Sequence, residues 1–353
     1  MDRTLRKWGT LSNSNRMTVR EMARLAGVSV ATVSRVFNGT GQVSEEMRQR
    51  VLESIKAHGY RPDHRGQALA ARRHNAIGLV FPGLAGPYFA ELIQGFEQEA
   101  VRARASVHIL CTHLREDSEE QVIEMARRVD GLAVIGGTVS DEAVLTLAGR
   151  LPVVTLAGTG PGAVPSIRAE NKVSMHALTT HLLADHGLAD LIFVGSPDGS
   201  PDVSERWDGF RAAHRDLGRP VRHRPVRVGL AQEDGVMVAD SLLRRKTVPQ
   251  AVVCANDETA LGMLMGALGA GVRVPDDIVI TGFDDVPMAA LVSPGLTTVR
   301  QPIRELAAET ARQLLRAIPG PDSAAPHGRL LPTELVVRRS CGCAAAGTST
   351  TDP

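Results

Sequence analysis

The sequence predicts an α/β protein with a small, separate all-α module at its N-terminus. The first 75 residues contain three short segments of helical length, and the remainder alternates short apolar runs with amphipathic helices. Apolar runs separated by helices indicate parallel sheets with βα crossovers. A chain of 353 residues also exceeds one ordinary core, so two or three domains are expected.

The charge is divided between these two parts. Residues 1–75 carry 14 Lys or Arg against 6 Asp or Glu, whereas the remainder carries 26 against 33. A basic head on a mildly acidic body indicates a polyanionic partner for the head alone. The polar, basic first 16 residues do not resemble a secretory signal, and the chain has no long apolar run. We therefore expect a cytoplasmic protein without a membrane partner.

The segment VSVATVSRVFN, residues 28–38, has helix length but is rich in β-branched and hydroxyl residues, which helix interiors usually avoid. Placed on a helix, it has an apolar face and a small polar face with one long cation. The apolar face comprises Val33, Val36 and Phe37. The polar face comprises Val30, Ala31, Ser34, Arg35 and Asn38.

Helices are predicted on both sides of this segment. Ser29 is placed to cap its N-terminus, and Gly27 fits the C′ position of an earlier helix, TVREMARLA. Ser44 is placed to cap a third helix, EEMRQRVLESIKAH. Two short helices joined by a Gly-containing turn predict a helix-turn-helix. Small side chains on its second helix would let the backbone approach a DNA major groove, where Arg35 can reach a guanine edge. A plain three-helix bundle is the alternative.

Residues 18–63 closely resemble the DNA-binding headpiece of the lactose/galactose repressor family. The agreement includes the AGVS-ATVSRV-N core and the GYRP exit. The resemblance implies base recognition by Val30, Ala31 and Arg35, and phosphate contacts from Thr32 and Ser34. The full set of expected DNA-binding residues is Thr18, Ser29, Val30, Ala31, Thr32, Ser34, Arg35, Asn38 and Leu69.

The basic segment HRGQALAARRHN, residues 64–75, corresponds in that family to a hinge helix that folds over the operator. Leu69 matches the family leucine that wedges into the minor groove, where an apolar wedge unstacks a base step and bends the duplex. An ordinary linker is the alternative.

In the α/β part, polar side chains follow several predicted strands, and ligands of parallel sheets bind at the carboxyl ends of strands. An arginine, an amide, a carboxylate and an aromatic ring suit a polyhydroxylated ligand. The candidate effector-binding residues are Tyr88, Phe89, Arg206, Asn256, Asp284 and Gln301. Two structural alternatives remain open, since Asp257 could simply cap a helix and Arg206 could form a surface ion pair.

The resemblance extends over the α/β part through CANDETALG, VPDDIVITGFDDVPMAALVSPGLTTVRQP and LLPTELVVRRS. It implies a periplasmic-binding-protein type I core of two Rossmann-like subdomains, in which Arg206, Asn256 and Asp284 hold effector hydroxyls. The GLAGPYF loop and Glu170, where the family usually has aspartate, depart from the pattern.

The expected domains follow from these segments. They are a disordered extension at 1–16, with Met17 as an alternative start, a helix-turn-helix domain at 17–63, a hinge at 64–75, an effector-binding and dimerisation domain at 76–345, and a disordered tail at 341–353. The N-subdomain is expected at about 76–168 and 297–322, and the C-subdomain at about 169–296 and 323–340.

No metal site, cofactor or catalytic residue is expected. Cys341 and Cys343 form a lone CGC, which offers too few ligands for structural zinc. His113, His176, His181 and His186 are expected to be structural or incidental. Common nucleotide-binding and hydrolase motifs are missing, which disfavours an enzyme.

These observations predict a transcriptional repressor that binds a pseudo-palindromic operator as a homodimer and responds to a small-molecule effector, most simply a sugar. A tetramer is less favoured. The alternatives are a periplasmic-type sugar- or nucleoside-binding protein without regulatory role, and a regulator that responds to a purine co-repressor.

Overall fold

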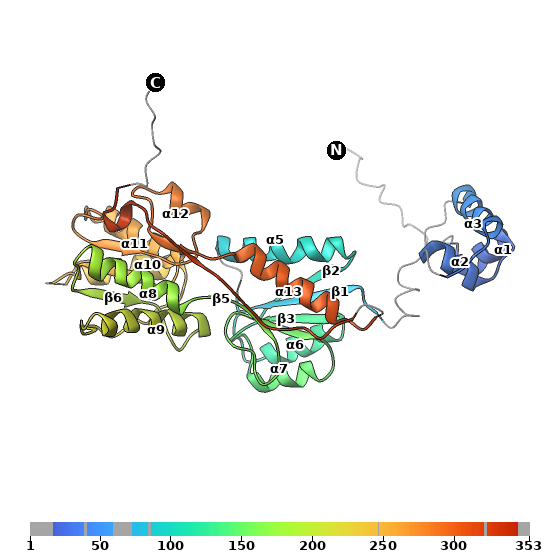
Figure 1. Ribbon diagram of the computed structural model, residues 1–353, viewed down its shortest axis with the longest axis horizontal. Helices are drawn as coiled ribbons and strands as arrows, with labels where there is room; N and C mark the ends of the chain where they lie inside the picture. The colour runs from blue at the N-terminus through green and yellow to red at the C-terminus, as the bar shows by residue number, and fades with distance from the viewer. Residues whose placement is uncertain are drawn as a thin grey trace, which may run out of the picture. The chain divides into compact units, whose positions relative to one another are not determined.

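The computed structural model describes residues 17–38, 41–58, 73–83, 86–245, 247–320 and 323–344. The chain divides into two compact units, residues 1–74 and 75–353 (Figure 1). No helix in the described ranges is both long and apolar enough to cross a membrane.

The first unit contains three helices, α1 (Val19–Ala26), α2 (Val30–Asn38) and α3 (Glu45–His58). They pack around a small core that comprises Met22, Ala23, Ala26, Val33 and Val51. The turn between α1 and α2 contains Gly27 at φ 63°, a left-handed conformation that favours glycine. The Arg50 guanidinium of α3 donates to the Gly27 carbonyl at 3.2 Å, which fastens the third helix to this turn.

The second unit contains a six-stranded sheet of order β10-β5-β4-β3-β1-β2, in which every pair is parallel. Its strands are β1 (Ala76–Phe81), β2 (Ser106–Cys111), β3 (Gly131–Ile135), β4 (Val153–Leu156), β5 (Ser166–Ala169) and β10 (Arg329–Leu331). Its helices are α5 (Pro87–Arg102), α6 (Ser118–Ala126), α7 (Asp141–Ala148) and α13 (Ile303–Ala317). Figure 1 shows α5 and α13 on one face of this sheet and α6 and α7 on the other.

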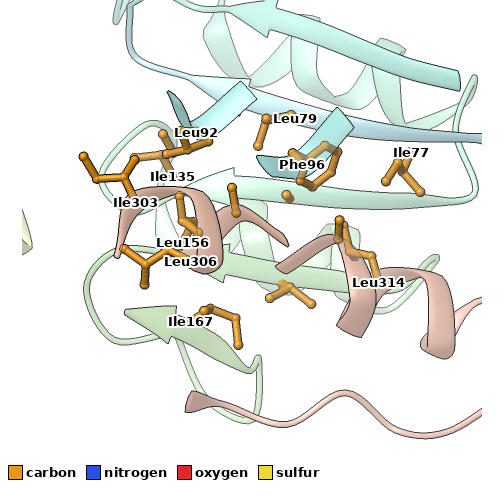
Figure 2. Close-up of a cluster of buried hydrophobic side chains, with 14 of the residues drawn as sticks. Ile77, Leu79, Leu92, Phe96, Ile135, Leu156, Ile167, Ile303, Leu306 and Leu314 are labelled. Carbon is orange, nitrogen blue, oxygen red and sulfur yellow. The ribbon is translucent and has the colours of Figure 1, made fainter. Parts of the chain in front are cut away.

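The alternation of side chains along β1 explains these two layers. Ile77, Leu79 and Phe81 point into the core under α5 and α13 (Figure 2), whereas Ala76 and Val80 point into the core under α6 and α7. The helices α5 and α13 approach so closely that a Cβ on Gly95 would lie 2.2 Å from the Arg304 carbonyl oxygen. Figure 2 shows the buried side chains that this layer encloses.

A second parallel sheet, of order β6-β7-β8, forms the other subdomain of this unit. Its strands are β6 (Leu191–Val194), β7 (Ala251–Cys254) and β8 (Val279–Thr281), and β9 (Thr298–Arg300) pairs antiparallel with β11 (Glu334–Val336) beside it. The helices are α8 (Lys172–Thr180), α9 (Pro201–Asp216), α10 (Gln232–Leu243), α11 (Asp257–Gly269) and α12 (Pro287–Leu291). A π-turn, η1 (His181–Asp185), extends α8, and a 3₁₀ turn, η2 (Arg339–Cys341), follows β11.

Two strand pairings correct the expected subdomain boundaries. β9 lies with the second sheet, so the chain leaves this subdomain after residue 300 and not near 297. β10 pairs with β5 of the first sheet, so the return crossing lies after residue 331 and not near 322. Both β9 and β10 are three-residue strands that contain an arginine, so neither forms a continuous apolar run that could be assigned from sequence.

The C-terminal segment also differs from expectation. Cys341 is buried and Cys343 is half-buried, at positions where we expected a tail without structure. Cys111 is only half-buried because β2 is an edge strand of its sheet.

Candidate functional site

The helix α2 has the two faces that its sequence predicts. Val33 is buried, whereas Val30, Ala31 and Arg35 are exposed. The Ser29 hydroxyl accepts a hydrogen bond from the Thr32 amide at 3.0 Å, which confirms Ser29 as the N-cap of this helix. The exposed face therefore combines small side chains with one long cation.

Three of the expected DNA-binding hydroxyls already have structural partners. Thr18 caps α1, since its Oγ1 accepts from the Glu21 amide at 3.2 Å while the Glu21 carboxylate accepts from the Thr18 amide at 2.7 Å. This capping box lowers the pKa of Glu21. The hydroxyls of Ser29 and Thr32 lie 2.9 Å apart. DNA contacts from these three residues stay predictions.

The stem of Arg35 lies across the loop after α2. A Cβ on Gly41 would come within 3.3 Å of the Arg35 Cδ, and Gly41 has φ 75°. A glycine at this position lets the long side chain lie close to the backbone. The side chain of Asn38 and the whole of Leu69 lie outside the described residues, as does most of the expected hinge segment.

Arg206 is not at the surface, so it does not form the surface ion pair that its sequence context left open as an alternative. It is 4% exposed on α9. Its Nε donates to Asn171 Oδ1 at 2.8 Å, and its Nη1 donates to the Ala255 carbonyl at 2.7 Å. The guanidinium carbon also lies 3.9 Å from the centre of the Phe283 ring, in cation–π geometry.

Asp284 and Gln301 lie beside this guanidinium. The Gln301 amide donates to Asp284 Oδ1 at 2.5 Å, and Arg206 Nη1 lies 3.6 Å from the same oxygen. Burial raises the pKa of Asp284 to about 8, although Arg206 and Gln301 oppose the shift. Gln301 Oε1 is buried and has no hydrogen-bond partner among the described residues. The group therefore contains an unused acceptor next to a carboxyl that titrates near neutrality.

Asn171 and Asp202 belong to the same polar group, and sequence reasoning did not select them. Asn171 is fully buried and donates to Asp202 Oδ1 at 3.1 Å while it accepts from Arg206. Asp202 Oδ1 also accepts from the Gly158 amide at 3.1 Å. The sequence did contain a signal for Asn171, because residues 168–171 read RAEN, with Glu170 where the family usually has aspartate. Glu170 itself caps α8, since its carboxylate accepts hydrogen bonds from the amides of Val173 and Ser174.

Asn256, and not Asp257, is the N-cap of α11. Its Oδ1 accepts from the Thr259 amide at 3.1 Å, and its amide donates to the Leu230 carbonyl at 2.9 Å. Asp257 is fully buried and accepts from Thr298 Oγ1 at 2.6 Å. Burial raises the pKa of Asp257 to about 7. Asn256 therefore has a structural role whether or not it also binds a ligand.

The two aromatic candidates come from the other subdomain. Tyr88 and Phe89 begin α5, and their rings meet edge to face with centroids 5.3 Å apart. Burial raises the pKa of Tyr88, and the charges of Asp202 and Asp284 raise it further. The structure thus brings Tyr88 within electrostatic range of the polar group around Arg206.

The segments that connect the two subdomains adjoin this polar group. Asn171 follows β5, and Gln301 follows β9. At the third crossing, Thr333 Oγ1 donates to the Glu170 carbonyl at 2.7 Å and lies 2.6 Å from Ser174 Oγ. A change in the contacts of Arg206 or Asp284 can therefore alter the segments that connect the two subdomains. Any movement between the subdomains depends on these segments. An apolar hollow of about 520 Å³, lined by Leu145, Ala317 and Pro326 among others, lies away from these residues.

A helical module with a small-faced second helix, followed by a two-subdomain α/β unit with buried polar residues at its crossings, defines a DNA-binding transcriptional regulator. Residues 18–63 match the model of the lacI family of bacterial regulatory proteins, and residues 180–341 match a periplasmic binding protein-like domain.

Whole-chain comparisons agree with this class. Catabolite control protein A of Priestia megaterium is 30% identical over 306 residues, covering 85% of this chain and 92% of that protein. The HTH-type transcriptional regulator DegA of Bacillus subtilis (strain 168) is 31% identical over 336 residues, covering 92% and 97%. The chain belongs to the lacI family of bacterial regulatory proteins, and its function is transcriptional regulation and not catalysis.

Solved structures show the same fold. The Lac repressor dimer bound to operator and the anti-inducer ONPF has a TM-score of 0.81 at 25% identity, covering 93% of this chain and 99% of that one. The complex of the transcriptional regulator CelR with cellobiose has a TM-score of 0.67 at 27% identity, covering 92% and 100%.

Proposed function

We propose that this regulator is a repressor controlled by a small polyhydroxylated effector, most simply a sugar, which binds at Arg206, Asp284 and Gln301. The observation that carries this proposal is the buried Gln301 Oε1, an acceptor without a partner among the described residues, beside a charged donor and a carboxyl. A buried polar atom without a partner is costly, and a ligand hydroxyl would satisfy it.

Effector binding and DNA binding are coupled in this proposal through the crossings. A ligand hydroxyl at Asp284 competes with the contacts that Arg206 and Gln301 make to it. Because Asn171 and Gln301 adjoin two of the crossing segments, exchanging these contacts favours a different arrangement of the subdomains. The coupling free energy then appears as a change in operator affinity.

A purine is the second candidate effector. A repressor named PurR from Pasteurella multocida is 30% identical over 328 residues, covering 92% of this chain and 98% of that protein. The half-buried Tyr88 ring, within electrostatic range of the polar group around Arg206, supplies an aromatic face on which a base would stack. A ribose operon repressor from Halalkalibacterium halodurans, 30% identical over 325 residues, supports the sugar with equal weight.

The DNA-binding form in this proposal is a homodimer on a pseudo-palindromic operator in the cytoplasm, with α2 in the major groove and Leu69 in the minor groove. The operator-bound relative above is a dimer. The described surface of α10 and α11 exposes four large apolar side chains, Val236, Met237, Met265 and Leu268, which a partner subunit would cover.

A thermal-shift screen of sugars, sugar phosphates and purines tests the effector class, since a ligand that binds only the folded state raises the midpoint by mass action. The expected result is stabilisation of wild type by one chemical class and loss of that stabilisation in Arg206→Ala. Equal stabilisation of both proteins would place the effector elsewhere. Trp207, which packs on Phe193 and Phe210 next to Arg206, gives an independent fluorescence readout.

A further inference from the structure

Two histidines and two cysteines meet in the C-terminal subdomain, away from the polar group around Arg206. His181 and His186 come from the end of α8, and Cys341 and Cys343 come from the end of the chain. One ligand atom from each lies within 4.8 Å of all the others. In the sequence, only the two cysteines lie close together. The fold brings to them two imidazoles that lie more than 150 residues earlier in the chain.

Four of the six distances between the ligand atoms are close to those around one tetrahedral ion, and the other two are at most 4.8 Å. Zinc binds imidazole nitrogen at about 2.0 Å and thiolate sulfur at about 2.3 Å, so tetrahedral ligands are separated by about 3.3 Å for two nitrogens and about 3.5 Å for nitrogen and sulfur. The Nε2 atoms of His181 and His186 are 3.1 Å apart. His181 Nε2 lies 3.6 Å from each sulfur, and His186 Nε2 lies 3.3 Å from Cys343 Sγ. An N₂S₂ donor set of this shape selects zinc.

A local departure from α-helical geometry aligns the two histidines. Five residues of α-helix rotate a side chain by about 140° relative to the first, which would separate His181 from His186. The π-turn instead joins them directly, because the His186 amide donates to the His181 carbonyl at 3.3 Å. Such single π-turns occur frequently at functional sites.

The two cysteines are placed by a second unusual turn. Gly342 has φ 97°, and its amide donates to the Arg339 carbonyl at 3.0 Å. This left-handed glycine turns the chain so that sulfurs two residues apart face the same histidine. Ser340 anchors the segment, since its buried hydroxyl donates to the Ile280 carbonyl at 2.6 Å and accepts from the Thr297 amide at 2.8 Å.

A carboxylate orients the first histidine. Asp185 Oδ2 lies 2.8 Å from His181 Nδ1, so this ring nitrogen carries the proton and Nε2 faces the sulfurs with its lone pair. Metal-bound histidines almost always have such a partner on the other ring nitrogen. The arrangement thus includes the ligands, their turns and an orienting carboxylate.

We propose that His181, His186, Cys341 and Cys343 bind one zinc ion in a closed structural site. The ion fastens the C-terminal segment to the π-turn of α8 and stabilises this subdomain. Four protein ligands leave no position for water or substrate, so the site is structural and separate from effector binding. It stands independently of the proposed effector.

The test uses the full-length chain, reduced, freed of metal with a chelator and titrated with Co²⁺. The expected result is one Co²⁺ per chain with the visible ligand-field bands of a tetrahedral site and a thiolate charge-transfer band, both removed by stoichiometric Zn²⁺. Cys343→Ser and His186→Ala should lose the bands, whereas Cys111→Ser, which changes a half-buried cysteine on β2, should keep them.

A subtler variant checks the orienting role of Asp185. Asp185→Asn should keep the one-to-one stoichiometry and weaken Zn²⁺ binding by about 10- to 100-fold. In wild type, Zn²⁺ should also raise the unfolding temperature, and in Cys343→Ser it should not. The proposal is overturned if reduced wild type binds no Co²⁺ with thiolate bands, if Cys111→Ser loses them equally, or if a Cys341–Cys343 disulfide forms that resists reduction and excludes metal.

Discussion

The carboxyl of Asp284 should make the stability of its subdomain depend on pH. Its pKa is raised to about 8 in the folded protein, mainly by burial, against about 3.9 in an unfolded chain. Between these values the folded state holds one more proton, so the free energy of unfolding falls by about 1.4 kcal/mol per pH unit. The contribution is complete below about pH 4 and is lost as the pH rises to about 8.

The assay is urea unfolding of wild type and Asp284→Asn, followed by Trp207 fluorescence in a Trp8→Phe background. From about pH 5 to about pH 7, wild type should lose about 2.7 kcal/mol that the Asn variant does not lose. Because Arg206 lowers the pKa of Asp284, Arg206→Met should extend this loss to higher pH. If the free energy of unfolding depends on pH in the same way in wild type and Asp284→Asn, the assignment of a buried, largely protonated carboxyl is refuted.

Three further predictions concern DNA contacts and packing. Arg35→Ala should cost about 1–3 kcal/mol per half-site on an operator selected from random DNA, and an equal loss on non-specific DNA would show a phosphate contact only. Leu69→Ala should reduce operator bending measured by FRET without changing effector binding, and unchanged bending would make this segment a passive linker. Gly95→Ala should destabilise the protein by about 1–3 kcal/mol in thermal unfolding, because its Cβ would overlap the Arg304 carbonyl oxygen, whereas an unchanged midpoint would mean that α5 and α13 can separate.

The main elements of the fold could be predicted from sequence because their signals are local. The short apolar runs that predicted parallel sheets became strands β1, β2, β3, β4, β6, β7 and β8. The short strands β5, β9, β10 and β11 were missed, since each contains a polar residue and none forms a continuous apolar run. Their neighbours in the sheet fix them.

The site was predicted in part. The position after a strand indicated Asp284 and Gln301, and the family resemblance indicated Arg206. The structure brings these three side chains together and adds Asn171 and Asp202, while their role in effector binding stays a prediction. These two were missed because their role depends on contacts across the fold. The histidine–cysteine cluster was missed for the same reason, and its π-turn and left-handed glycine have no signature that spacing alone reveals.

In the proposed mechanism, effector binding and operator binding are coupled, and reciprocal titration measures this coupling. Operator affinity is measured by fluorescence anisotropy with and without the effector found by the thermal-shift screen, and effector affinity is measured with and without operator. We expect effector to change the operator affinity by the same factor by which operator changes the effector affinity. In Arg206→Ala, we expect normal operator binding that effector no longer changes. An effector that binds free and operator-bound protein with equal affinity would contradict the proposed coupling.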